Sequence, residues 1–202
     1  MKNHKLSKLL LASVISSLTV PTFAQQLEEV VVTASKRAEN LQDIPQAVTA
    51  FSSERLVELG IVETSDLMGA VPNIQVTSAY GRTQPNFSIR GISVANEFSA
   101  ATASPVGVYV DEVYQSFRAS HGQQLFDLES VEVLRGPQGT LYGRNTTGGA
   151  VNVNTIKPSL GEGASGFLNV RLGNYSYADF TGAVEATIIP DVLGVRLSGA
   201  VS

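Results

Sequence analysis

Few residues of this sequence have the type and spacing that catalysis or metal binding requires. The 202-residue chain has no cysteine and two histidines, and one of these, His4, lies in a segment with the features of a cleaved leader. His121 alone supplies neither a His-based metal site nor a Ser-His-Asp triad. The neighbouring acids Asp111 and Glu112 would point to opposite faces of a strand, so they do not predict a glycosidase-type pair. We therefore expect no enzyme and no cofactor.

Glycine has the most unusual spacing, in the run Leu134–Asn152 (LRGPQGTLYGRNTTGGAVN). Such a run invites comparison with phosphate-binding loops, but it contains no Gly-Lys-Ser/Thr and fits no G-x-G-x-x-G register. Glycines at this density are needed where the backbone turns with positive φ or where two segments approach closely. The run, which we call the signature run, predicts tight turns in a confined volume.

Short elements must position this run. Polar and apolar spacing predicts a capped helix between Ser52 and Gly60 and a second helix over Thr64–Ala70, which Val71-Pro72 should end. We expect loops at Ser93–Pro105 and Phe117–Gln124. Strands are predicted where β-branched and aromatic residues run between turn residues, namely at Ile74–Ser78, Phe87–Ile92, Val106–Val113, Val131–Leu134 and Ala150–Thr155.

A strict period of two begins after Pro158. Residues 166–173, 177–188 and 193–202 alternate between an apolar and a more polar face, and tight turns at Gly173-Asn174 and Pro190-Asp191 separate them. Segments of about ten residues with this alternation are typical of transmembrane barrel strands. A soluble β-sandwich would show the same alternation.

The amino terminus has the three regions of a secretory signal. Three lysines precede the apolar stretch Leu9–Val20, and small residues lead to Ala24. A transmembrane helix, the alternative, would need about 20 apolar residues. We predict export and cleavage after Ala24. Loss of three lysines makes the net charge of −4 more negative, so we expect no nucleic-acid partner.

Residues Glu28–Ala34 (EEVVVTA), which we call the coupling segment, interrupt a polar stretch. Consecutive β-branched residues favour an extended backbone. By itself this pattern fits an edge strand or a solvated linker equally well.

The signature run resembles the L-R-G-P-x-x-x-L-Y-G-x-x-x-x-G-G-x-V/I-N motif of the plug domain of TonB-dependent outer-membrane receptors. Ser88–Ile92 (SIRGI) is similar to the I-R-G segment of that family, and the coupling segment is similar to its TonB box. The order of the segments is also that of the family. The matching residues of the run include Pro137, Gly139, Leu141, Tyr142, Gly143, Gly148, Gly149 and Asn152.

The resemblance implies an α+β plug domain with a small mixed sheet, short helices and long loops, followed by the first antiparallel strands of a transmembrane β-barrel. In the family the plug fills a 22-stranded barrel. The implied order is a signal peptide at 1–24, a TonB-box segment and linker at 25–43, the plug at 44–158 and about three barrel strands at 159–202.

The resemblance also implies functional residues. TonB would pair by strand addition with the coupling segment, that is, with Glu28, Glu29, Val30, Val31, Val32, Thr33 and Ala34. Contacts of the plug with glutamates of the barrel wall are expected at Arg90, Gly91, Arg135 and Gly136; the alternative is that both arginines are solvated. Candidates for ligand contact in the outward loops are Tyr80, Arg82, Gln84 and Phe98, which could equally be solvated.

The implied function is ligand-gated, TonB-energised import of a ferric siderophore or similar scarce nutrient across the bacterial outer membrane. The expected partners are TonB, outer-membrane lipid and the small-molecule ligand. Three strands cannot close a barrel, and their open edges would be costly in lipid. We therefore expect either a fragment of a longer receptor or a truncated product that at most binds TonB or ligand as a periplasmic module.

Overall fold

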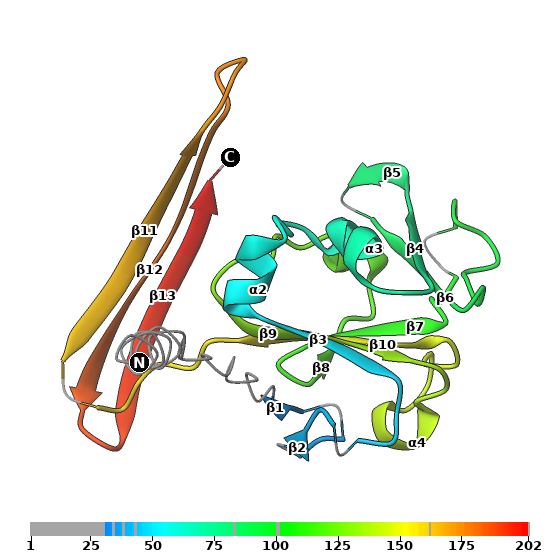
Figure 1. Cartoon of the computed structure of the whole chain (residues 1–202), viewed down its shortest axis with the longest axis horizontal. Helices are drawn as coiled ribbons and strands as arrows, with labels where there is room; N and C mark the ends of the chain where they lie inside the picture. Colours follow the sequence, from blue (N-terminus) through cyan, green and yellow to red (C-terminus); the bar gives the residue numbers. More distant parts are fainter. Residues whose placement is uncertain are drawn as a thin grey trace, which may run out of the picture.

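The computed structural model describes residues 31–33, 35–37, 39–42, 44–82, 84–99, 102–161 and 163–201. The expected signal peptide and its cleavage site at Ala24 lie outside these residues. Figure 1 shows two bodies, a mixed α/β unit and a long three-stranded sheet that stands beside it. None of the helices described is both long and apolar enough to cross a membrane.

The α/β unit is built on a five-stranded sheet with the order β3-β9-β10-β7-β8. These strands are β3 (Val48–Ser52), β7 (Val106–Val110), β8 (Val113–Tyr114), β9 (Leu128–Arg135) and β10 (Gly149–Thr155). β10 runs parallel to β7, and the other pairs are antiparallel. The small mixed sheet expected from the sequence is confirmed.

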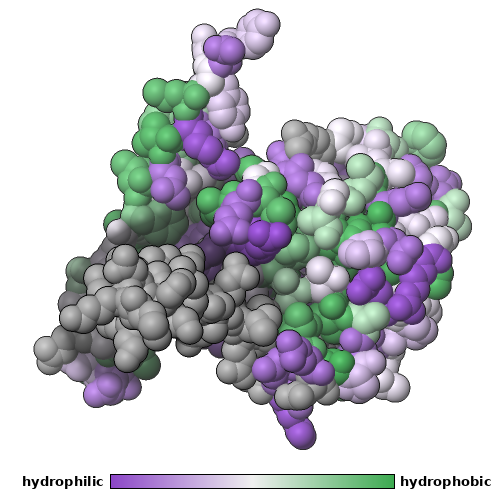
Figure 2. Space-filling view, viewed as in Figure 1, coloured by the Kyte–Doolittle hydropathy of each residue, from purple (hydrophilic) through white to green (hydrophobic). Residues whose placement is uncertain are grey.

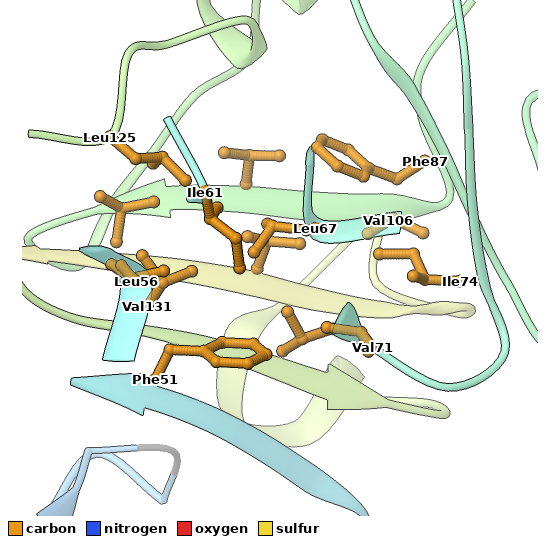
Figure 3. Close-up of a cluster of buried hydrophobic side chains, with 14 of the residues drawn as sticks. Phe51, Leu56, Ile61, Leu67, Val71, Ile74, Phe87, Val106, Leu125 and Val131 are labelled. Atoms are coloured by element: carbon orange, nitrogen blue, oxygen red, sulfur yellow. The ribbon is translucent and has the colours of Figure 1, made fainter. Parts of the chain in front are cut away.

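The larger hydrophobic core lies on one face of this sheet. Three short helices cover it, α2 (Ser53–Glu58), the 3-10 helix η1 (Thr64–Asp66) and α3 (Leu67–Ala70). The hairpin of β4 (Ile74–Thr77) and β6 (Asn86–Ile89) extends this layer. Figure 3 shows side chains of both layers packed together, among them Phe51, Leu56, Leu67, Phe87 and Val131.

A smaller core lies on the opposite face. It is covered by the short pair β1 (Val31–Val32) and β2 (Glu39–Asn40) and by α4 (Gly139–Tyr142). Side chains alternate along β9, so Val131 and Val133 belong to the larger core whereas Glu132 and Leu134 face the smaller one. The central strands are therefore buried on both faces.

Both predicted helices are observed, the second as η1 followed by α3, but three predictions about the loops and strands were wrong. The strand expected over Phe87–Ile92 ends at Ile89, because Arg90 and Gly91 turn the chain with φ angles of +53° and +79°. The strand expected over Val106–Val113 is broken into β7 and β8 by Asp111 and Glu112, whose φ angles are +46° and +68°. Positive φ at both central residues is the geometry of a tight two-residue hairpin turn, so the two acids do not lie on a strand. The expected loop Phe117–Gln124 contains the 3-10 helix η2 (Arg118–His121). β3 and β5 (Ala79–Arg82) were not predicted.

The second body is an antiparallel meander of β11 (Ala164–Leu172), β12 (Ala178–Ile189) and β13 (Leu193–Val201). The period of two places polar Asp179 and Thr181 on the buried side, toward the α/β unit. The other side is apolar and exposed, with Leu168, Leu172, Val184, Ile188, Leu197 and Val201 each more than 60% accessible. Apolar surface follows the side of this sheet that faces away from the α/β unit (Figure 2).

Candidate functional site

The described part of the coupling segment is docked on the α/β unit. Val31 pairs with Asn40, and Val32 pairs with Glu39, in the antiparallel pair β1-β2. The Val32 side chain is only 1% exposed and belongs to the smaller core, together with Tyr109, Leu134, Tyr142 and Ala150. The segment thus forms part of the cover of the sheet.

A buried carboxylate binds Thr33, the next residue of the coupling segment. Glu132 of β9 is fully buried, and its Oε1 accepts a hydrogen bond from the Thr33 backbone N–H at 2.6 Å and another from the Thr33 hydroxyl at 3.0 Å. The side-chain amides of Asn152 and Asn154 donate to the same carboxylate at 3.4 Å each. All these donors are neutral. Within the described ranges no lysine or arginine forms an ion pair with Glu132.

The same network reaches the signature run. Asn152 donates to the Tyr142 hydroxyl at 2.6 Å, and the Tyr109 hydroxyl donates to the Tyr142 carbonyl at 2.6 Å. Burial raises the pKa of Tyr142 to about 12, and the nearby Glu132 charge adds to this, whereas the hydrogen bond from Asn152 opposes it. The phenol therefore stays neutral and links α4 to β10.

The signature run connects the end of β9 to the start of β10, and backbone hydrogen bonds close its turns. The backbone N–H groups of Gly136, Gln138 and Gly148 donate to protein carbonyls at 3.0, 2.9 and 2.9 Å. These three N–H groups are bonded within the protein, whereas a phosphate-binding loop offers its N–H groups to the ligand. Close approach explains Gly149, because a Cβ there would lie 2.3 Å from the Leu134 carbonyl oxygen. At Gly143 the reason is instead a φ of +81°.

Comparison with known proteins decides the family. The sequence-family model of the TonB-dependent receptor plug domain matches residues 40–150, which is more than half of the chain. The chain belongs to the TonB-dependent receptors. The matched part of the plug runs from β2 to the start of β10, so it includes Glu132 and most of the signature run.

Individual relatives agree with this assignment. The chain is 34% identical to the pesticin receptor of Yersinia pestis over 138 residues, which are 68% of this chain and 20% of that protein. It is 26% identical to the vitamin B12 transporter BtuB of Vibrio vulnificus over 163 residues, 75% of this chain and 25% of that protein. The chain thus spans only about a fifth to a quarter of the length of these relatives.

Solved structures share the fold. The ferric yersiniabactin uptake receptor FyuA from Yersinia pestis superposes with a TM-score of 0.65 at 29% identity, over 76% of this chain and 24% of that one. The ferripyoverdine receptor of the Pseudomonas aeruginosa outer membrane gives a TM-score of 0.68 at 20% identity, over 85% and 22%. The expected plug fold, followed by antiparallel strands without a closed barrel, is confirmed.

The structure describes only some of the predicted TonB-box residues. Val31, Val32 and Thr33 are described, and Val31–Val32 form the expected strand. Glu28, Glu29, Val30 and Ala34 lie outside the described residues. Pairing with TonB stays a prediction.

The two predicted plug–barrel motifs meet each other on the plug. Arg90 lies in a turn with φ of +53° rather than in a strand, and its Nη1 is 3.1 Å from where a Cβ of Gly136 would be. Arg90 and Gly91 are exposed, Arg135 is half-buried with a buried, unpartnered Nε, and Gly136 is buried. The pairing of these arginines with glutamates of a barrel wall stays a prediction.

Two of the predicted ligand-contact residues lie together. The Tyr80 hydroxyl donates to the Phe98 carbonyl at 3.0 Å, and the two rings meet edge to face with centroids 6.4 Å apart. Both are exposed, at 52% and 72%. Gln84 is half-buried, and its carbonyl accepts from Ser78 at 3.0 Å, whereas Arg82 ends β5. Contact of this aromatic pair with a ligand stays a prediction.

The loop that carries Phe98 rests on a buried cation that the sequence did not single out. Arg118 is 4% exposed; it donates to the Asn86 side chain at 2.6 Å, to the Glu97 carbonyl at 3.2 Å and to the Ser99 carbonyl. One turn later, His121 is 2% exposed. Burial lowers the pKa of His121, the hydrogen bond to the Gln115 carbonyl opposes this, and the Arg118 charge adds to it. Neither residue stands in a motif that could have identified it.

The ionic contact between the plug and the meander was also missed. Arg196 of β13 binds both carboxylate oxygens of Asp127 in the plug, with Nε to Oδ2 at 3.0 Å, and its Nη1 binds Glu185 of β12 at 2.7 Å. The three side chains are 11%, 5% and 15% exposed. The period of two placed Arg196 and Glu185 on the polar face, but nothing in the sequence pointed to Asp127.

Proposed function

We propose that this chain is the coupling and gating end of a receptor that imports a scarce nutrient across the bacterial outer membrane with energy drawn through TonB. One observation carries the proposal. The coupling segment is docked directly on Glu132, in the strand that leads into the signature run. A force applied to that segment would act on β9, an interior strand of the plug sheet.

The other parts of the chain support the same function. The exposed apolar face of β11–β13 suits a lipid environment, with polar residues turned toward the plug. The segments that we propose are a signal peptide cleaved after Ala24, a TonB-box segment to residue 43, a plug to residue 158 and barrel strands beyond it. The receptor does no chemistry on its cargo.

The proposed cargo is a ferric siderophore. The names of FyuA and of the ferripyoverdine receptor support this class, whereas that of BtuB favours vitamin B12. The exposed aromatic pair of Tyr80 and Phe98 offers a surface on the plug for either ligand. Competition between ferric siderophores and vitamin B12 in a binding assay separates the two classes.

The test of TonB coupling is the substitution Val31→Pro in the receptor that contains this chain. Proline removes the backbone N–H that strand addition uses. We expect loss of TonB cross-linking and of energy-dependent uptake with unchanged ligand binding. Val31→Ala keeps the N–H and serves as the matched control. Normal uptake by the proline variant would refute the assignment of the TonB box.

A further inference from the structure

The described part of the coupling segment, Val31–Thr33, has modest support besides Glu132. The β1-β2 pair consists of two residue pairs, and hairpins of that size are at best marginally stable in water. Val32 adds the burial of one aliphatic side chain. The Lys36 ammonium group lies 5.5 Å from the centroid of the Tyr142 ring, a cation–π contact of modest strength at an exposed site.

The hydrogen bonds to Glu132 are of a stronger kind. A bond from a neutral donor to a buried carboxylate is charge-assisted, and such bonds are shorter than those between neutral groups. The 2.6 Å distance from the Thr33 backbone nitrogen to Glu132 is at the short end for an N–H donor. The Thr33 hydroxyl donates to the same oxygen and accepts from Asn154 at 3.2 Å. Among the described residues, one threonine therefore supplies two of the four donors to the Glu132 carboxylate.

Departure of the segment is costly for the plug itself. When Thr33 leaves, the donors that remain among the described residues are Asn152 and Asn154, whose bonds to the Glu132 carboxylate are longer, at 3.4 Å each. A buried charge that loses its donors carries a desolvation penalty. The vacated site therefore favours return of the segment.

We propose that Glu132 is a latch that positions the TonB box on the plug and sets how often the box is free to meet TonB. The inference rests on the proposed function, because it concerns regulation of the same segment. The latch is a property of the plug alone. It acts through the backbone and hydroxyl of Thr33 and needs no ligand.

The test measures how often the segment opens. The chain has no cysteine, so the substitution Val32→Cys introduces a single thiol at a position that is 1% exposed. A water-soluble maleimide modifies this thiol only when the segment leaves the sheet. In the full chain, Glu132→Gln removes the charge but keeps the shape, and we expect the modification rate to rise about ten- to a hundredfold, since bonds to charged groups exceed neutral ones.

Two controls separate a latch from general loosening of the plug. Glu129→Gln changes an exposed glutamate of the same strand and should leave the rate unchanged. A thiol at Val133, in the larger core, should stay protected in the Glu132→Gln background. Equal rates with and without Glu132→Gln would overturn the proposal, and so would equal acceleration at Val32 and Val133.

A last measurement keeps this inference separate from the proposed function. In the receptor that contains this chain, Glu132→Gln should increase TonB cross-linking at the coupling segment. Faster thiol modification with no TonB cross-linking in any variant would support the latch and contradict the TonB assignment. Unchanged modification with normal TonB cross-linking would contradict the latch and leave the assignment standing.

Discussion

Alanine substitution of the signature glycines should destabilise the plug in a graded order that the structure sets. Gly139, Gly143 and Gly149 lie within eleven residues of one another in the same run, yet their surroundings differ. A Cβ at Gly139 or Gly143 meets nothing within 4 Å, whereas at Gly149 it meets the Leu134 carbonyl oxygen at 2.3 Å and the Ile89 Cδ1 at 2.8 Å.

The expected magnitudes follow from these differences. Gly139 begins α4 with an ordinary φ, so Gly139→Ala should change stability by less than about 1 kcal/mol, in the stabilising direction. Gly143, at φ +81° and ψ −153°, lies in a region that is essentially restricted to glycine, so Gly143→Ala should cost about 1–3 kcal/mol through backbone strain alone. Gly149, at φ +154°, adds a backbone clash to strain and should cost about 3–5 kcal/mol.

Pulse proteolysis of the full chain in urea, in a mild detergent, measures these differences as shifts in the unfolding midpoint. A plug with a total stability of about 5–15 kcal/mol would lose a large part of it with Gly149→Ala. Gly139→Ala is the matched control. Equal midpoints for the Gly139 and Gly149 variants, or a reversed order, would refute the reasoning that close approach rather than ligand binding requires Gly149.

Two further predictions concern the buried ionisable groups, His121 and the Asp127–Arg196 pair. Burial lowers the pKa of His121 in the folded plug. The free energy of unfolding that depends on this neutral histidine should therefore be fully present above the pKa of the unfolded state, about 6.5, and should fall as the pH drops below that value. Urea midpoints at pH 7 and pH 5 should differ in the wild type and much less in His121→Gln. For the plug–meander contact, a double-mutant cycle of Asp127→Asn and Arg196→Gln should give a coupling free energy above about 0.5 kcal/mol, measured by pulse proteolysis, whereas additive effects would show that the pair holds nothing together.

The local patterns that the sequence predicted correctly are those that depend on few neighbours. The helix before Gly60 was predicted from a capping serine and a terminal glycine, and Ser52 does accept a hydrogen bond from the Arg55 N–H. The meander was predicted from a period of two, which depends only on alternation across a sheet with one buried face. The signature run was correctly read as tight turns, because glycine density reflects backbone geometry.

Predictions that needed knowledge of a distant partner were incomplete or wrong. The strand over Val106–Val113 continued through Asp111 and Glu112 in the sequence, but these residues turn the chain so that Val110 pairs with Val113. Arg118 carried no signal because its partners are an asparagine and two backbone carbonyls far along the chain.

The sequence by itself determined the family, the mixed plug and the two faces of the meander, because these follow from a long motif and from local periodicity. Only the tertiary structure decided that Thr33 lies against Glu132, 99 residues away in the sequence, and that Asp127 meets Arg196. Each of those contacts joins a polar side chain to a partner that the folding of the sheets brings near. Neither of these contacts follows from spacing along the chain, so both were found only from the burial and the hydrogen bonds of the folded protein.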